Sequence, residues 1–351
     1  MSGERDLYFL RNLWYYALPG QQLQPGQLLG KTLLEEPILF GRTEAGQVFA
    51  MRDLCPHRGV PLRYGRLVGT EVECPYHGWR FNPQGECTLI PGLVAEQQFN
   101  TQKICVQSYP VREVQGNIWI FMPAKPGDQP PLELDIPTVP GFGLDFAAQA
   151  WQQFQFPCHV DYAISGLVDP QHVPFVHRAW WWRTDAPLFE KAKAFDPAPL
   201  GFTMRRHRLL KTTFFYRLLG GTPEVEISFQ LPGVRIEATF TGPNTLCNLT
   251  TMTPITATQT EVTTLFYWTT PWITWLKPFL LPFVNTFVHQ DLAMVAKQQE
   301  GLRYDPNLML VGDGDAQVRW YYQVKKEFSQ AQAEGREFTN PVKSQILRWR
   351  S

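Results

Sequence analysis

Two short stretches carry cysteine and histidine side chains at a spacing that can hold a metal cluster. Cys55 and His57 form a C-x-H pair, and Cys74 and His77 form a C-x2-H pair after the intervening residues 58–73. Two thiolates and two imidazoles suit a two-iron, two-sulfide cluster in which histidines replace two of the cysteines on one iron. These four side chains are therefore candidate cluster ligands.

A zinc site is the main alternative for these stretches, because zinc also takes two cysteines with two histidines. Zinc modules usually pair their cysteines with each other and their histidines with each other, whereas each stretch here mixes one of each. A disulfide between Cys55 and Cys74 is less favoured again, since it would leave both histidines without a role.

The sequences of the two stretches, CPHRG at 55–59 and CPYHGW at 74–79, resemble those of the loops of Rieske [2Fe-2S] proteins. Rieske proteins of respiratory complexes carry an extra cysteine in each loop, but this chain has Tyr76 in the second loop and no spare cysteine in the first. The resemblance is therefore to the oxygenase and ferredoxin branch, and it implies a cluster of lower potential.

A second group of chemically capable residues lies at Asp169, His172 and His177. The chain has only seven histidines, and two of them are here. Asp169 and His172 are three residues apart and would share a helix face. His172 and His177 would not, but Pro174 predicts a bend that could turn both imidazoles towards one point. Two histidines with a carboxylate are the ligand set of oxygen-activating non-haem Fe(II) sites. Taken alone, the pattern also fits one satisfied core histidine and one surface histidine.

Downstream of Rieske-like loops, the spacing D-x2-H-x4-H resembles that of Rieske non-haem iron oxygenases, in the phthalate/vanillate-type branch of terminal oxygenase alpha subunits. The resemblance implies that His172 and His177 bind a mononuclear Fe(2+). It also implies that Asp169 bridges towards the Rieske histidine, His57 or His77, of a neighbouring subunit.

The family's third iron ligand is an aspartate on a late helix, and Asp291 is the best match. Asp185 and Glu300 are weaker candidates, and an ordinary charge near a helix start is the alternative for Asp291. The family often has an Asp-Asn or Glu-Asn pair just before the bridging aspartate, where this chain has Ser165-Gly166. Asp161 is expected either to take over the orienting role or to be a solvated turn residue.

The first part of the chain is turn-dense and predicts an all-β domain that frames the two loops. Residues 37–42 and 47–52 flank a glycine-containing turn and predict a hairpin. Residues 106–114 and 118–122 predict a second hairpin, in which Pro110 indicates an edge strand or a bulge. We expect a Rieske domain over residues 1–130, with a proline- and glycine-rich linker at 123–131.

The remaining residues, 131–351, predict a catalytic domain of the α+β class. Period-two alternation predicts antiparallel strands, and helical spacing predicts two helices. The strands are expected at 151–156, 224–231, 234–240 and 261–270, and the helices at 284–302 and 315–333. The resemblance implies a helix-grip fold, an antiparallel sheet with a long C-terminal helix.

The resemblance further implies a terminal oxygenase that uses O2 to hydroxylate or oxidatively demethylate a small molecule. No flavin or nicotinamide motif is visible, so the electrons are expected from a separate NAD(P)H-dependent reductase or ferredoxin. A homotrimer is implied, because electrons tunnel well only over short gaps and a neighbour can supply the cluster. The alternatives are an electron carrier with a non-catalytic second domain and a zinc-stabilised binding module.

Composition sets the remaining expectations. Lys+Arg and Asp+Glu are both 32, so nothing favours nucleic acid as a partner. The six cysteines show no paired spacing outside the cluster, and the N-terminus has no apolar signal-peptide core, so we expect a reducing, cytoplasmic location.

The substrate is the least constrained feature, and the 14% aromatic content favours an apolar or aromatic one. The apolar run 272–288 is expected to be a buried core wall, with a greasy substrate entrance and a shallow membrane contact as the alternatives. Trp180, Trp181 and Trp182 are expected in the core or at an interface rather than as a stacking platform.

Overall fold

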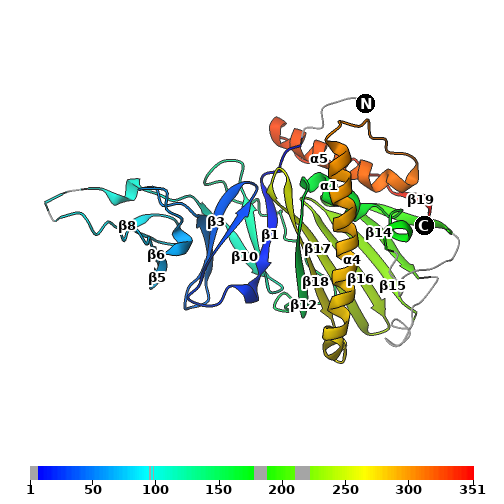
Figure 1. Ribbon diagram of the computed structural model, residues 1–351, viewed down its shortest axis with the longest axis horizontal. Helices are drawn as coiled ribbons and strands as arrows, with labels where there is room; N and C mark the ends of the chain where they lie inside the picture. The colour runs from blue at the N-terminus through cyan, green and yellow to red at the C-terminus, as the bar shows by residue number, and fades with distance from the viewer. Residues whose placement is uncertain (1–6, 95, 98, 178–187, 210–221) are drawn as a thin grey trace. The chain divides into compact units, whose positions relative to one another are not determined.

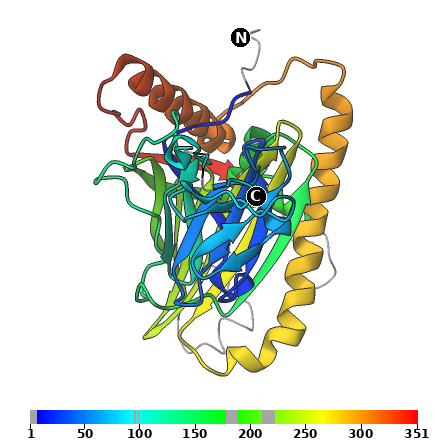
Figure 2. The ribbon, with the colours of Figure 1, turned by 90° about the vertical axis from the view of Figure 1, so that its left-hand side faces the viewer.

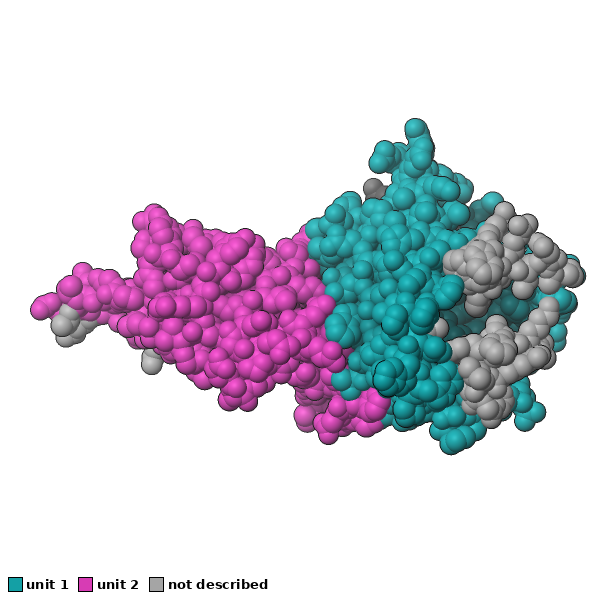
Figure 3. Space-filling view, turned by 60° about the horizontal axis from the view of Figure 1, so that its bottom comes forward, with its two compact units in different colours: residues 1–10, 139–142, 147–351 teal, residues 11–138, 143–146 magenta. Residues whose placement is uncertain are grey.

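The computed structural model describes residues 7–94, 96–97, 99–177, 188–209 and 222–351, and these residues divide into two compact units. Figure 3 colours the two units separately. The N-terminal unit comprises residues 11–138 and 143–146. The C-terminal unit comprises the other described residues, so the segment at 139–146 is shared between the two.

The N-terminal unit is built almost entirely of short antiparallel strands, as the turn-dense sequence predicts. They form three sheets, ordered β1-β11-β10, β2-β3-β4-β9 and β5-β6-β7-β8. The elements are β1 (Leu13–Pro19), η1 (Gly20–Gln22), β2 (Leu28–Leu33), β3 (Glu36–Arg42), β4 (Val48–Arg52), η2 (Leu62–Tyr64), β5 (Arg66–Val68), β6 (Glu71–Glu73), β7 (Arg80–Phe81), β8 (Cys87–Leu89), η3 (Thr101–Lys103), β9 (Ser108–Tyr109), β10 (Val111–Val114) and β11 (Asn117–Met122).

Both predicted hairpins are confirmed, and Pro110 acts as expected. The first hairpin is β3 with β4. In the second, the expected strand at 106–114 is split at Pro110: β9 pairs with β4, and β10 pairs with β11. Proline has no N–H to donate to a ladder, so the chain leaves one sheet and joins another at this residue.

A small core lies behind the two cysteine-histidine loops. Its buried members come from the strands that precede and follow the loops, and they include the loop cysteines themselves. They are Leu39, Phe49, Met51, Cys55, Leu62, Val72, Cys74, Phe81, Cys87 and Val106. Each loop is therefore anchored at its cysteine, while exposed residues such as Tyr76 lie at its tip.

The C-terminal unit is one eight-stranded antiparallel sheet with helices, which confirms the expected α+β class (Figure 1). The strand order is β12-β18-β17-β16-β15-β14-β13-β19. The elements are β12 (Ala150–Phe156), α1 (Val160–Val168), α2 (Val173–Val176), β13 (Glu190–Ala198), β14 (Gly201–Arg208), β15 (Glu224–Gln230), β16 (Val234–Thr241), β17 (Asn244–Thr256), β18 (Gln259–Trp268), α4 (Ile273–Leu302), η4 (Asp313–Asp315), α5 (Ala316–Glu334) and β19 (Gln345–Arg350).

The long helix α4 runs alongside the sheet and contacts its edge strand β12 (Figures 1 and 2). The Gln152 side-chain amide donates a hydrogen bond of 3.1 Å to the Leu281 carbonyl. Further along, the Phe154 and His289 rings pack edge to face, with centroids 5.5 Å apart. These contacts fix the position of α4 along β12, and this position brings Asp291 close to His172 and His177.

The first half of α4 differs from the sequence expectation. The run 272–288 is not a buried core wall, because Trp275 is 84% exposed and Phe279 is 68% exposed. The helix begins at Ile273 rather than at 284, and it contains Pro278 and Pro282. Only part of the run is buried: Ile273 lies in a small core cluster, and Trp272 and Leu281 pack against that cluster.

No single helix among the described residues is long and apolar enough to cross a membrane. The two parts of α4, Ile273–Phe279 and Leu281–Leu302, together reach that length and composition, and they meet at an angle of 53°.

A buried ion pair joins α1 to α5. Asp161 is only 1% exposed, so the alternative of a solvated turn residue is wrong. Its carboxylate accepts hydrogen bonds from Lys325 Nζ at 2.6 and 2.7 Å and from the Tyr321 hydroxyl. Burial lowers the pKa of Lys325, and the neighbouring Asp161 charge opposes that effect.

Replacing Asp161 with Ala is expected to destabilise the C-terminal unit by about 3–5 kcal/mol, because it leaves the Lys325 ammonium buried without its counter-charge. Chemical denaturation followed by far-UV circular dichroism measures the effect. Glu327→Ala is the matched control, since it breaks a solvent-exposed α5 ion pair with Arg336 and should move the midpoint much less. Equal midpoints for the two variants would contradict a structural role for the buried pair.

Candidate metal centres

The two cysteine-histidine loops fold into the same turn. In the first loop, Gly59 N–H donates to Cys55 O at 2.8 Å, and Cys55 N–H donates to Val60 O at 2.9 Å. In the second loop, Gly78 N–H donates to Cys74 O at 3.1 Å, and Cys74 N–H donates to Trp79 O at 2.8 Å. A glycine four residues after each cysteine therefore closes each loop.

Both closing glycines need the left-handed backbone region. Gly59 has φ 71° and Gly78 has φ 70°, values that L side chains rarely adopt. A Cβ at Gly59 would have nothing within 4 Å, so its constraint is conformational rather than steric. The repeated glycine is thus the local feature that gives the two loops one shape.

The side chains of the two loops converge. The His57 and His77 ring centroids are 4.4 Å apart, and Trp79 stacks on His57 at 4.5 Å. Cys55 and Cys74 are both buried, and burial raises the pKa of the Cys55 thiol to about 11, with Cys74 adding to the rise.

These loop residues fit a bound cluster. His57 Nδ1 is buried and has no hydrogen-bond partner among the described residues. A buried imidazole nitrogen without a partner is costly unless a metal takes its lone pair, and thiols bind a metal by losing their protons. The four residues predicted as cluster ligands are thus gathered in one place, with a donor set suited to [2Fe-2S].

Replacing Gly59 with Ala is expected to destabilise the N-terminal unit by about 1–2 kcal/mol. The cause is that the Cβ of alanine comes too close to the following carbonyl oxygen in the left-handed region. The visible circular dichroism of the reconstituted cluster during thermal unfolding reports the change. Gly92→Ala is the matched control: it also has nothing within 4 Å of its Cβ, but its φ is not left-handed. A Gly59→Ala protein as stable as Gly92→Ala would show that the loop does not depend on this conformation.

The second group is positioned by a helix of only four residues. α1 ends at Val168, so Asp169 is its C-cap rather than a residue on a shared helix face with His172. His172 and His177 flank α2 at its N-cap and C-cap. The predicted bend at Pro174 is not seen within a helix. Pro174 lies instead in the first turn of α2, where its missing N–H costs nothing. One short turn therefore separates the two imidazoles and turns them inward.

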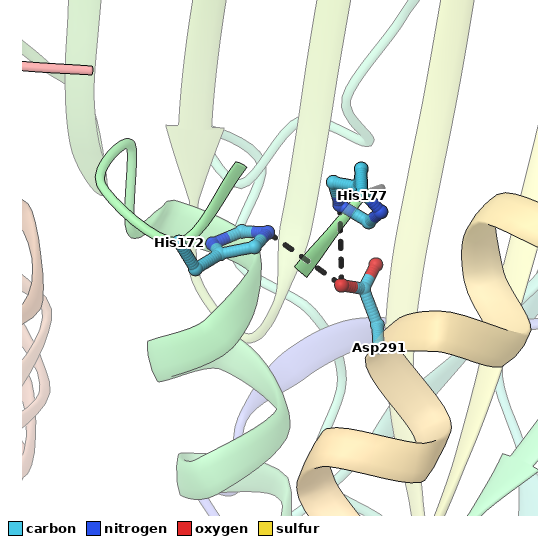
Figure 4. A group of neighbouring side chains, drawn as sticks. All are labelled: His172, His177 and Asp291. Carbon is cyan, nitrogen blue, oxygen red and sulfur yellow. Dashed lines mark ion pairs between the residues drawn. The ribbon is translucent and has the colours of Figure 1, made fainter. Parts of the chain in front are cut away.

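The structure brings His172, His177 and Asp291 together (Figure 4). Asp291 Oδ1 lies 3.5 Å from His172 Nε2 and 3.3 Å from His177 Nε2. One ligand atom from each residue lies within 4.8 Å of the others. Asp169 is adjacent, with Oδ2 3.6 Å from His172 Nδ1.

Burial shapes the electrostatics of this group. It lowers the pKa of His177 to about 4, and it raises the pKa of Asp291 to about 6. Burial also opposes a positive charge on His172, but the neighbouring carboxylates of Asp169 and Asp291 outweigh that effect, so its pKa is raised.

A divalent cation fits this donor set. His177 Nε2 is buried and has no hydrogen-bond partner among the described residues. A cation between the two Nε2 atoms and the carboxylate would take the lone pair of His177 Nε2 and offset the burial of the Asp291 charge. Two histidines and one carboxylate with remaining open positions are the set that Fe(II) oxygenases use.

The other predicted site residues are placed as follows. Asp169 Oδ1 accepts a hydrogen bond of 2.7 Å from Gln171 N–H, and the Asp169 side chain is 27% exposed. Asp161 contacts α5 and His159 rather than His172 or His177, and its orienting role stays a prediction. Glu300 is exposed, nine residues beyond Asp291 on α4. Asp185 and the three tryptophans at 180–182 lie outside the described residues.

Sequence reasoning missed two residues of α4 that contact His177. Gln290 Oε1 lies 3.1 Å from His177 Nδ1, and the Phe287 ring stacks on the imidazole with centroids 3.4 Å apart. Gln290 and Asp291 are three and four residues after Phe287, and this spacing is the signal that could have found them, because residues three and four apart are neighbours on a helix surface.

Comparison with known proteins identifies the first domain. The Rieske [2Fe-2S] domain family matches residues 13–110. Chlorophyllide a oxygenase of Chlamydomonas reinhardtii is 35% identical over 207 residues, which is 54% of this chain and 29% of that protein. The oxygenase component of dicamba O-demethylase of Stenotrophomonas maltophilia is 35% identical over 174 residues, which is 49% of this chain and 48% of that protein.

The fold extends the likeness over nearly the whole chain. The crystal structure of dicamba monooxygenase bound to dicamba superposes with a TM-score of 0.71 and 21% identity, covering 93% of this chain and 99% of that one. By sequence, the chain spans about a third to a half of the length of these two relatives. The domain match shows that residues 13–110 form a Rieske [2Fe-2S] domain, the relatives named above are oxygenases, and the chain shares the fold of dicamba monooxygenase.

Proposed function

We propose that this protein is the terminal oxygenase of a Rieske system. In this proposal residues 1–130 form the Rieske domain and residues 131–351 the catalytic domain. The enzyme uses O2, and electrons from a separate NAD(P)H-dependent reductase or ferredoxin, to hydroxylate or oxidatively demethylate an apolar or aromatic small molecule. The carrying observation is the convergence of His172, His177 and Asp291 in a chain that also holds a Rieske domain.

The relatives support the reaction class. The Chlamydomonas protein is named as an oxygenase, and the Stenotrophomonas protein is named as the oxygenase component of a demethylase. The phrase "oxygenase component" also supports a separate electron donor for this chain. The phthalate/vanillate-type branch remains part of the proposal.

Each site residue has a proposed role. Cys55, His57, Cys74 and His77 hold the [2Fe-2S] cluster, and His172, His177 and Asp291 hold a mononuclear Fe(2+). The iron, when bound, supplies O2 activation at its open positions. Asp169, with Oδ2 3.6 Å from His172 Nδ1, orients that imidazole so that its Nε2 faces the metal.

A homotrimer is the proposed assembly, with Asp169 bridging to His57 or His77 of a neighbouring subunit. The surface beside Asp169 supports a docking face. Gln171 packs against Gly314, where a Cβ would come within 2.1 Å of the Gln171 side chain. Residues 308–311, which end three positions before Gly314, are Leu, Met, Leu and Val. All four are exposed, with Met309 at 79%. An apolar run of this kind beside a functional group is typical of an interface.

We also place the protein in the cytoplasm. All six cysteines lie within the described residues, and none is in a disulfide. Burial raises the pKa of Cys158 and of Cys247 to about 12, which suits inert reduced thiols.

Replacing His172 with Ala is expected to abolish O2-coupled product formation while leaving the visible spectrum of the cluster intact, because the two metal sites use different ligands. The assay combines the anaerobically reconstituted protein with a generic reductase and a panel of aromatic compounds. Metal and sulfide analysis accompanies it: wild type should hold three irons and two sulfides per chain, and the variant two irons and two sulfides. Turnover by His172→Ala would refute the assigned site.

The same analysis separates the alternatives. An electron carrier with a non-catalytic second domain predicts two irons and two sulfides in wild type as well. A zinc-stabilised binding module predicts zinc without sulfide.

Replacing Met309 with Asp is expected to dissociate the assembly, because a charge at the centre of the apolar run opposes docking. Light scattering coupled to size exclusion should give wild type three times the 40.4 kDa chain mass and the variant the mass of one chain. Leu132→Asp is the matched control, a charge at another exposed leucine in the N-terminal unit, and it should remain trimeric. A monomeric wild type would exclude the trimer itself.

A further inference from the structure

One face of α4 surrounds the imidazole of His177. Phe287, Gln290 and Asp291 stand at positions i, i+3 and i+4, so they lie on the same side of the helix. The Phe287 ring is nearly parallel to the imidazole, at 14°. Gln290 reaches Nδ1 at 3.1 Å, and Asp291 faces Nε2 at 3.3 Å. Each edge of the ring and one of its faces therefore meet a different α4 side chain.

The Gln290 contact selects one tautomer of the ring. The atom facing Nδ1 is the amide oxygen, which can only accept a hydrogen bond. This contact is a hydrogen bond only when Nδ1 carries the proton and donates it, a tautomer that leaves the lone pair on Nε2. That lone pair points towards the Asp291 carboxylate, where His172 Nε2 also converges.

The partner of His177 is neutral, whereas the partner of His172 is acidic. His172 has the Asp169 carboxylate beside its Nδ1, at 3.6 Å. A carboxylate at position 290 would place a third negative charge next to Asp169 and Asp291 in a buried group. An amide supplies the same acceptor atom without that charge, so it orients the ring at a lower electrostatic cost.

We propose that Gln290 is a positioning residue that fixes the tautomer and orientation of His177 for metal binding, with Phe287 fixing the plane of the ring. This inference rests on the proposed function, because it takes His177 as an iron ligand. Outer partners of this kind commonly change metal affinity by about 10–100-fold when they are removed.

The test measures metal affinity rather than turnover. Co2+ is titrated by calorimetry into the full-length protein after its cluster is assembled and the mononuclear site is cleared with a chelator. Gln290→Leu keeps the side-chain size but removes the acceptor, and it should weaken Co2+ binding by about 10–100-fold. Gln290→Glu restores the acceptor and should recover most of the loss. Gln298→Leu, the same change at an exposed position of α4, should bind as wild type does.

A second readout follows the ring itself. Nitrogen-15 NMR of the Zn2+-loaded protein, with the His177 signals assigned from a His177→Ala sample, reports which nitrogen carries the proton. Wild type should show a single form protonated at Nδ1, and Gln290→Leu should broaden or shift these signals. A merely structural contact would leave this signature unchanged.

The outcomes separate the two proposals. If wild type binds Co2+ and Gln290→Leu matches it in both affinity and tautomer, the positioning role is wrong and the proposed function stands. If wild type and His177→Ala bind Co2+ equally, or neither binds, the iron site and the proposed function fail together.

Discussion

The central constraint on this structure is that several buried side-chain donor atoms lack a hydrogen-bond partner within the polypeptide. His57 Nδ1, His172 Nδ1 and His177 Nε2 are buried and have no hydrogen-bond partner among the described residues, and the Asp291 charge is raised in energy by burial. Without a bound metal, nothing would offset the free-energy cost of burying these polar groups. In the C-terminal unit, His172, His177 and Asp291 place their ligand atoms within 4.8 Å of one another, so a single metal ion could reach all three.

The two units build their sites by different means. In the N-terminal unit, one local turn is used twice, and a left-handed glycine closes each copy. In the C-terminal unit, three separate elements meet: α1 delivers the segment at Asp169, α2 separates the histidines, and α4 brings Asp291. The buried pair of Asp161 with Lys325 fixes α1 against α5, and β12 fixes α4 against the sheet. The buried Asp161–Lys325 pair therefore supports the helix that leads to Asp169 and the proposed iron ligands.

Much of this arrangement could be predicted from the sequence, and the failures have physical causes. The proposed cluster ligands in the loops could be predicted because a motif of a few residues determines the turn. The fold class could be predicted because strand alternation and helical spacing are local patterns. The burial of 272–288 was mispredicted, because apolar content does not tell which helix face is covered. The setting of Asp161 was missed because its partner Lys325 is 164 residues away. Gln290 was missed because a single amide forms no motif.

The distance along the chain between ligands also affects how each site is assembled. Cys55 and His77 belong to one compact stretch, so the polypeptide can close that site early, over a short loop. His172 and Asp291 are separated along the chain by six strands of the large sheet, β13 to β18. Because long-range contacts form late in folding, the nascent protein is expected to be competent for cluster insertion before it can retain the single iron. Maturation of such a chain would then have a fixed order, with the mononuclear metal loaded last.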